Sequence, residues 1–364
     1  MKPEQKAGAV VQTVHINGKW LRQRFTGVQR YSEEIATRIV KADDIHFVLH
    51  VPKGAPVPAW AEEAGVEVRI APISGALFDQ LYLPLASRGQ YLLNFGGIAP
   101  VFKRLQLATF HDAAPFRFPK THTRLFVAVY FVAFFVVSRI ARQLATVSDF
   151  SRGELAGFLR VDPSRFLVVP CGADSFDPAD VQRPDVSWAD RNYLIVGTVA
   201  HHKNVMAPAR ALAQSGRHVV VVGVGRMRPG DYAAKIFADA DMSFGDGVTL
   251  TERLTDNELR WLYRNATALV FPSLYEGFGL PVLEAQVMGC PVIASTAASI
   301  PEVAGDGALF FDPHDTADLL RQLDEFDTNP AAADTLTVRG TANAERFSWQ
   351  GSAERLLGWI RSVA

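Results

Sequence analysis

Cysteine is scarce in this sequence, with only Cys171 and Cys290 among 364 residues. The two are far apart, and neither belongs to a CxxC or similar spacing, so the cysteines indicate no metal site. Isolated thiols of this kind are typical of small apolar residues in a reducing compartment. Residues 1–8 also lack the apolar core of a signal peptide. We therefore expect a cytoplasmic protein.

An excess of charge of either sign is absent as well. The chain has 37 Lys and Arg against 38 Asp and Glu, a formal net charge of -1. Proteins that bind nucleic acid usually attract phosphate through surplus positive charge, so the composition indicates no such partner. Hydrophobic residues make up 48% and charged residues 21%, which is ordinary for a globular chain. The length is sufficient for two domains.

No hydrophobic run reaches the length of a membrane-spanning helix. Residues 125–137 read LFVAVYFVAFFVV, whereas a spanning helix needs about 20 apolar residues. The simpler interpretation is a helix buried beneath a sheet. The alternative is a helix that lies in a bilayer surface, flanked by Arg124, Arg139 and Arg142.

Short apolar segments alternate with helical ones along nearly the whole chain. The apolar segments are rich in Val, Ile, Leu and Phe without strict alternation, which is typical of parallel strands covered on both faces. Expected strands are 10–16, 45–51, 66–71, 91–95, 107–111, 144–148 and 166–170, and then 193–199, 218–224, 248–251, 268–272, 291–295 and 308–311. The fold class is therefore α/β, with two doubly wound Rossmann-like sheets facing a deep cleft.

A segment rich in Asp and Pro, residues 172–191, has no periodic apolar face and is expected to link the domains. We predict a first domain at 1–175, a second at 176–345 and a final helix at 346–364. Ligands of such sheets bind at the carboxyl ends of the strands. The residues that follow the strands are therefore the candidates for chemistry.

The most informative segment is 271–301, FPSLYEGFGLPVLEAQVMGCPVIASTAASIP. A strand is followed by a loop with Gly277 and Gly279, and a helix is expected to begin near Pro281. The start of that helix offers free N–H groups and a positive dipole, which suit a phosphate. Glu276 and Glu284 lie on either side of this anion site, where carboxylates are better suited to hydroxyl groups. A ligand with phosphate between polyol groups is a nucleotide sugar.

The Glu-x7-Glu spacing within EGFGLPVLEA, followed by GCPVIAS and PEVAGDGALFFDP, resembles the signature of the retaining glycosyltransferases of family 4, which have the GT-B fold. The resemblance implies that Glu276 binds the donor sugar near the reacting centre and that Glu284 binds the ribose. It also implies that the loop and helix start contact the sugar and diphosphate, at Gly277, Phe278, Gly279 and Leu280. No cofactor is implied, and the last helix is expected to cross back to the first domain.

A second segment, 197–204 (GTVAHHKN), follows the first strand of the second domain. The family commonly has an Arg and a Lys here that hold the diphosphate. Lys203 matches the lysine and is assigned a catalytic role, while His202 stands near the expected place of the absent arginine. A histidine is only partly charged near neutral pH, so the second cation is left open.

Two further segments match the family at strand ends. His111 and Asp112 follow a strand of the first domain, where His111 is implied to act on the sugar or acceptor and Asp112 to bind substrate. Gly27 and Arg30, in TGVQRY, resemble the family's N-terminal loop for donor or acceptor. Ser148 fits the family pattern too, although a helix cap is its simpler role. In the second domain, Arg253 and Leu254 fall where relatives contact the base.

The resemblance implies a retaining hexosyltransferase, best matched to bacterial enzymes that use GDP-mannose for surface polysaccharide. The acceptor would be a saccharide or a sugar on polyprenyl diphosphate, with peripheral contact to a membrane surface. No metal is expected, because the Asp-x-Asp at 239–241 falls in a helical stretch. An epimerase or phosphorylase on the same fold, or a non-catalytic nucleotide-sugar-binding protein, remains the alternative. A dinucleotide oxidoreductase is disfavoured, since the glycines near Gly223 lack the required spacing.

Overall fold

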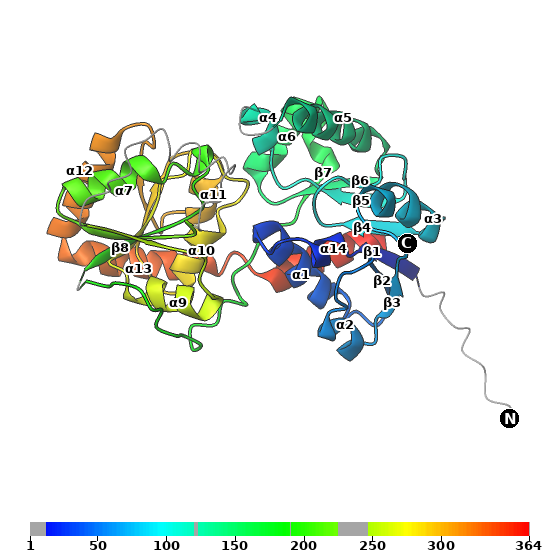
Figure 1. The fold of residues 1–364 in the computed structure, drawn as a ribbon, viewed down its shortest axis with the longest axis horizontal. Helices are drawn as coiled ribbons and strands as arrows, with labels where there is room; N and C mark the ends of the chain where they lie inside the picture. Colours follow the sequence, from blue (N-terminus) through cyan, green and yellow to red (C-terminus); the bar gives the residue numbers. More distant parts are fainter. Residues whose placement is uncertain (1–11, 120–122, 190, 225–246, 364) are drawn as a thin grey trace.

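The computed structural model describes residues 12–119, 123–189, 191–224 and 247–363, which form two lobes (Figure 1). The Asp-x-Asp at 239–241 and part of the glycine pattern near Gly223 lie outside these residues. Each lobe has one parallel sheet between helices, as the strand–helix alternation predicts.

The first lobe has seven parallel strands in the order β3-β2-β1-β4-β5-β6-β7. These strands are β1 (Gln12–Asn17), β2 (Ile45–Val51), β3 (Glu67–Ile70), β4 (Tyr91–Asn94), β5 (Gln106–Thr109), β6 (Gln143–Thr146) and β7 (Phe166–Val168). The order reverses direction between β1 and β4, so the loops after these two strands diverge and leave a crevice at the carboxyl edge. The helices are α1 (Gly27–Ile39), α2 (Ala59–Glu63), α3 (Leu83–Ala86), α4 (Ala114–Arg117), α5 (Arg124–Ile140) and α6 (Asp149–Leu159), with a π-helical turn η2 (Phe78–Tyr82) before α3.

The second lobe has six parallel strands in the order β10-β9-β8-β11-β12-β13. They are β8 (Asn192–Val196), β9 (His218–Val222), β10 (Val248–Thr251), β11 (Ala268–Phe271), β12 (Val292–Ser295) and β13 (Leu309–Phe311). The reversal falls between β8 and β11. The two segments with the richest sequence signal, 197–204 and 272–280, follow these two strands and therefore lie side by side. The helices are α7 (Met206–Gln214), α9 (Asp256–Asn265), α10 (Leu280–Val287), α11 (Ile300–Ala304), α12 (Thr316–Thr328) and α13 (Pro330–Ala344).

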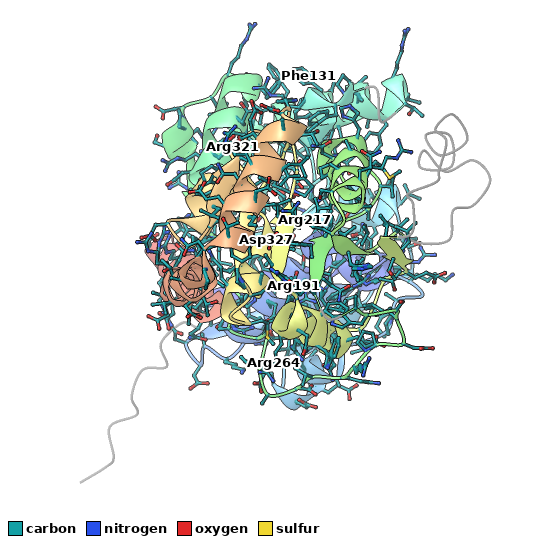
Figure 2. All side chains as sticks on the ribbon, turned by 90° about the vertical axis from the view of Figure 1, so that its left-hand side faces the viewer. Phe131, Arg191, Arg217, Arg264, Arg321 and Asp327 are labelled. Atoms are coloured by element: carbon teal, nitrogen blue, oxygen red, sulfur yellow. The ribbon has the colours of Figure 1, made fainter. Side chains whose placement is uncertain are left out.

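A network of charged side chains fastens α12 to the amino-terminal edge of the second sheet (Figure 2). The Asp327 carboxylate accepts hydrogen bonds from Arg191 at 2.7 Å, Tyr193 at 2.6 Å and Arg217 at 2.9 Å. The network lies at the end of the sheet opposite the site loops, so we assign it to stability.

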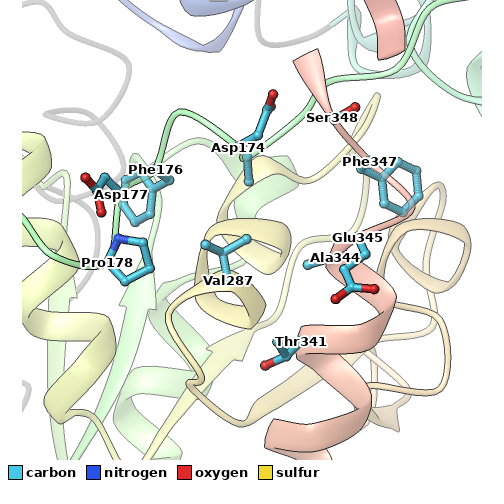
Figure 3. Close-up of a pocket in the computed structure, with 11 residues that line it drawn as sticks. Asp174, Phe176, Asp177, Pro178, Val287, Thr341, Ala344, Glu345, Phe347 and Ser348 are labelled. Atoms are coloured by element: carbon cyan, nitrogen blue, oxygen red, sulfur yellow. The ribbon is translucent and has the colours of Figure 1, made fainter. Parts of the chain in front are cut away.

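The last helix, α14 (Trp349–Ser362), packs against α1 of the first lobe (Figure 1). Trp349 is fully buried, with its ring 5.9 Å from that of Tyr31. The chain thus passes between the lobes twice, and the two passages touch: a Cβ on Gly172 would lie 2.2 Å from the backbone nitrogen of Trp349. A cavity of about 430 Å³ lies beside these passages, between Phe176, Val287 and Phe347 among others (Figure 3).

Helix α5 differs from the buried helix that its composition predicts. One face is in the core, where Phe134 stacks on Phe110 with ring centroids 3.9 Å apart. The opposite face is open to solvent, and Leu125, Val129 and Val132 are 75%, 49% and 59% exposed. The prediction is therefore right for one face and wrong for the other, because apolar residues all around a helix conceal which side the sheet covers. No helix within the described residues is long and apolar enough to cross a membrane.

Two histidines lie in the interior of the first lobe, joined in a chain of hydrogen bonds. His15 Nδ1 lies 2.7 Å from His50 Nε2, and His15 Nε2 lies 2.5 Å from the side-chain oxygen of Gln90. His50 Nδ1 lies 3.3 Å from the Tyr82 hydroxyl. The chain is satisfied with one proton on each ring, with His15 Nε2 donating to Gln90 and His50 Nε2 donating to His15 Nδ1. Burial lowers the pKa of His15, and it lowers the pKa of His50 from 6.5 to about 3.

This pair predicts a loss of stability in mild acid. Below pH 6.5 the unfolded chain takes up protons that the folded chain excludes, so the stability present at neutral pH decreases as the pH falls toward about 3. We expect the free energy of unfolding to fall by about 1 kcal/mol per pH unit for each such histidine. Urea unfolding at several pH values measures this slope. His50→Asn should make it shallower, whereas His218→Asn, at an exposed histidine, should not; equal slopes in all three proteins would contradict the prediction.

Candidate active site

The loop between β11 and α10 forms the centre of the site. Gly279 is the N-cap of α10 with φ +106°, a conformation in which glycine is favoured. The Ser299 hydroxyl lies 3.0 Å from the carbonyl oxygen of Glu276 and 2.8 Å from that of Phe278, and so holds the loop in place. The start of α10 at Leu280 is thereby placed at the carboxyl edge of the sheet, as the sequence predicts, although Pro281 has no N–H and that of Val282 donates to the Gly279 carbonyl oxygen.

Lys203 and Glu276 form an ion pair at this edge. Lys203 Nζ lies 2.8 and 2.9 Å from the two carboxylate oxygens of Glu276, whose side chain is 10% exposed. Asn204, with φ +49°, donates to the carbonyl oxygens of Pro272 and Pro313, and the N–H of Leu274 donates to that of His202. These bonds tie the two loops together and hold the cation beside the helix start.

The surroundings of His202 disfavour a charge on its imidazole. Burial lowers the pKa of the ring, and the neighbouring Lys203 charge lowers it further. The protein around His202 therefore favours the neutral ring over a second positive charge beside Lys203. The described residues contain no cluster of three or more His, Cys, Asp and Glu side chains arranged to hold a metal ion.

Glu284 is buried one turn inside α10 and faces the first lobe. Its carboxylate accepts a hydrogen bond from the Tyr263 hydroxyl at 3.2 Å and lies 3.4 Å from Arg30 Nη1 on α1. Arg30 Nη2 also lies 2.5 Å from an Asp256 oxygen. Burial raises the pKa of Glu284, and the Arg30 charge offsets only part of that effect. The structure thus brings Arg30 and Glu284 together, from sites 254 residues apart.

His111 and Asp112 meet the glycine loop from the first lobe. His111 Nε2 donates to the carbonyl oxygen of Phe95 at 2.7 Å, and burial lowers the pKa of the ring. The neutral ring therefore leaves Nδ1 as an acceptor. Asp112 accepts a hydrogen bond from the N–H of Ala114 at 2.8 Å. A Cβ on Gly277 would lie 2.7 Å from the His111 carbonyl oxygen, so only glycine permits this approach.

Two of the remaining predicted residues also lie between the lobes. Gly27 begins α1, and a Cβ there would lie 3.7 Å from a methyl group of Leu280. The Arg253 guanidinium donates to the carbonyl oxygen of Phe25, and its centre lies 5.4 Å from the Phe25 ring. Leu254 is half-buried against the core. Gly27 and Arg253 therefore contact the opposite lobe, whereas Leu254 is placed only against the core.

Sequence reasoning missed several contacts across this interface. Ser148 caps α6, as expected, but its hydroxyl also lies 2.6 Å from the carbonyl oxygen of Gly277. The Glu302 carboxylate of α11 accepts from the N–H groups of Asp149 and Phe150, at 2.8 and 2.9 Å. Glu302, which directly follows the helix-starting proline in PEVAG, is the sequence feature that could have indicated a contact. Its partner in the other lobe cannot be read from the sequence.

Comparison with known proteins agrees with this geometry. A sequence profile described as "Glycosyl transferases group 1" matches residues 190–328. The chain is 30% identical over 263 residues to O-antigen chain mannosyltransferase B of Escherichia coli, which covers 67% of this chain and 67% of the relative. The chain belongs to this family of glycosyltransferases. It is also 34% identical over 226 residues to an MMP alpha-(1->4)-mannosyltransferase of Mycolicibacterium hassiacum, which covers 59% of this chain and 53% of that relative.

Solved structures show the same fold for this glycosyltransferase. A sucrose-phosphate synthase from Thermosynechococcus elongatus superposes with a TM-score of 0.74 at 17% identity, over 97% of this chain and 99% of the other. A glycosyltransferase of lipopolysaccharide biosynthesis, WaaG, superposes with a TM-score of 0.66 at 15% identity, over 94% and 98%. The predicted GT-B fold is therefore confirmed.

The Glu302 contact predicts a local change on substitution. Glu302→Ala removes the acceptor of two N–H groups in the first turn of α6, at a cost of about 1 kcal/mol. We expect amide hydrogen exchange at residues 149–151 to become about fivefold faster. Asp306→Ala, at an exposed carboxylate beyond the same helix, is the matched control. Unchanged exchange in Glu302→Ala, or equal acceleration in both variants, would show that the contact does not hold the lobes together.

Proposed function

We propose that this glycosyltransferase moves a hexose from a nucleotide diphosphate sugar to an acceptor hydroxyl with retention of anomeric configuration. The observation that carries the proposal is the Lys203–Glu276 ion pair beside the start of α10. It combines a cation and the positive end of a helix for a diphosphate with a carboxylate for sugar hydroxyls. The family 4 assignment belongs to the same proposal.

In this mechanism the bond between the sugar C1 and the phosphate oxygen breaks, and its electron pair goes to the departing nucleotide diphosphate. Lys203 and the N–H groups of α10 stabilise that negative charge. The acceptor oxygen bonds to C1 from the same face and passes its proton to the departing phosphate. Glu276 holds the sugar, and the free Nδ1 of His111 accepts from a hydroxyl of the sugar or acceptor.

Glu284 is assigned to the ribose of the nucleotide, and Arg253 and Leu254 to the base. In the structure Arg30 and Tyr263 already bond to the Glu284 carboxylate. A ribose would therefore compete with Arg30 for one oxygen, so donor binding and the Arg30 contact between the lobes are linked. Gly27, Phe278 and Leu280 complete the wall around the donor.

Mannose from GDP-mannose is the donor that we propose. Support comes from the similar proteins of Escherichia coli and Mycolicibacterium hassiacum, which are named mannosyltransferases. A second O-antigen chain mannosyltransferase, from Salmonella typhimurium, is 31% identical over 216 residues and covers 58% of each chain. The acceptor would be a saccharide or a polyprenyl-diphosphate-linked sugar of bacterial surface polysaccharide, reached in the cytoplasm at the membrane surface.

The lysine gives a direct test of the mechanism. Lys203→Ala should lower turnover by on the order of a hundredfold or more, because it removes the positive charge at the leaving group. Release of nucleotide diphosphate from the donor measures this. Lys53→Ala, at an exposed lysine of the first lobe, should retain wild-type turnover. Near-normal turnover of Lys203→Ala would remove the lysine from the mechanism.

A panel of nucleotide sugars identifies the donor and separates the alternatives. We expect GDP-mannose to give the largest rise in thermal unfolding temperature and release of GDP only when acceptor is present, with or without a chelator. An epimerase would convert the nucleotide sugar without acceptor, and a phosphorylase would need inorganic phosphate. A binding protein without catalytic activity would show the thermal shift but release no nucleotide.

A further inference from the structure

Most of the exposed large apolar side chains of the described residues lie on neighbouring elements of the first lobe. Fourteen large apolar side chains are exposed within the described residues, and ten of them lie on η2 and the residue before it, α3, the loop before β5 and α5. We call this surface the docking face; its members are Leu77, Leu81, Leu85, Phe102, Leu125, Phe126, Val129, Phe131, Val132 and Phe135. Apolar patches of this extent on a soluble lobe usually contact another molecule or a membrane.

The elements of the docking face adjoin one another. Gln80 of η2 donates to the carbonyl oxygen of Ala99 and accepts from the N–H of Val101, so the turn is bonded to the loop that carries Phe102. Val101 in turn packs in the same cluster as Phe134 of α5. On α5 the exposed residues recur at a spacing of three or four, from Leu125 through Val129 and Val132 to Phe135. This spacing places them in one stripe along the helix.

The charge around the docking face is mainly positive, and Asp79 of η2 is neutralised by Lys19 at 3.0 Å. Residues 80–148 contain six Arg and two Lys but only one carboxylate, Asp112, although the whole chain is nearly neutral. Asp112 itself is at the interface between the lobes, where it accepts from the N–H of Ala114. Arg88, Arg104, Arg124 and Arg142 are exposed. An apolar stripe on α5 bordered by exposed arginines complements a layer with apolar chains beneath negative headgroups.

We propose that the docking face binds the surface of a bilayer that contains anionic phospholipid, with α5 lying in the interfacial layer. The face leads toward the site: Phe116 packs on Phe131 and Phe134 of α5, and Phe118 lies 5.8 Å from the rings of His202 and Tyr275. This proposal rests on the proposed function in one respect: binding through the docking face would hold the site beside a lipid-linked acceptor. The binding itself requires no substrate.

Co-sedimentation of the full chain with vesicles tests the proposal. We expect binding to vesicles of phosphatidylcholine with about 30% phosphatidylglycerol, and much weaker binding to phosphatidylcholine alone. The double variant Phe102→Ser and Val132→Ser should lower the partition coefficient about tenfold or more. Val338→Ser, at an apolar side chain on α13 that is 70% exposed, is the matched control and should leave it unchanged.

A second double variant tests the role of the arginines beside the docking face. Arg104→Gln with Arg142→Gln should weaken binding to the anionic vesicles and leave binding to neutral vesicles unchanged, and added salt should act in the same direction. Arg321→Gln, on α12 of the other lobe and 67% exposed (Figure 2), should have no effect. Equal binding to both kinds of vesicle would overturn the role of anionic lipid.

Two outcomes would overturn the docking face as a membrane site. One is wild-type binding that the Phe102 and Val132 substitutions do not change. The other is a dimer in light scattering that these substitutions dissociate, without vesicle binding, since the face would then join two copies. Nucleotide release with a water-soluble acceptor tests the proposed function separately from membrane binding. Lys203→Ala should abolish this release, and the double serine variant should retain it.

Discussion

The rest of the site depends on the close approach of Gly277 to the backbone of His111. A side chain at position 277 would need space that the His111 carbonyl oxygen occupies, at 2.7 Å from the position of a Cβ. The contact brings the carboxyl edges of two separate sheets together, and it is supported on the other side by the Ser148 hydroxyl. Because each edge is a switch point of a doubly wound sheet, the residues that follow the strands converge there.

Burying Glu284 has a cost that Tyr263 of its own lobe and Arg30 of the opposing lobe offset. Glu284 is removed from water, and its partner cation comes from α1 of the other lobe rather than from its own. Glu276, by contrast, is neutralised within its own lobe by Lys203. The Lys203–Glu276 pair is therefore complete within the second lobe. Glu284 gains its ion-pair partner only where the lobes meet.

Much of the fold could be predicted from the sequence, because parallel strands buried on both faces are continuous apolar segments. The start of α9 at Thr255 follows from a capping box, which the structure contains, and the start of α10 follows from glycine and proline at the expected positions. The exposed side of α5 could not be predicted, since a helix that is apolar all around has no periodic signal. The contacts of Arg30 and Glu302 were equally hidden, because they depend on how two lobes meet and not on any local pattern.

The position of α14 has a consequence for synthesis of the chain on the ribosome. The helix covers α1 of the first lobe, yet it is translated after the whole second lobe. While the second lobe is being made, the side of Tyr31 that later packs against Trp349 is uncovered. The amino-terminal half therefore cannot reach its final packing until α14 has left the ribosome.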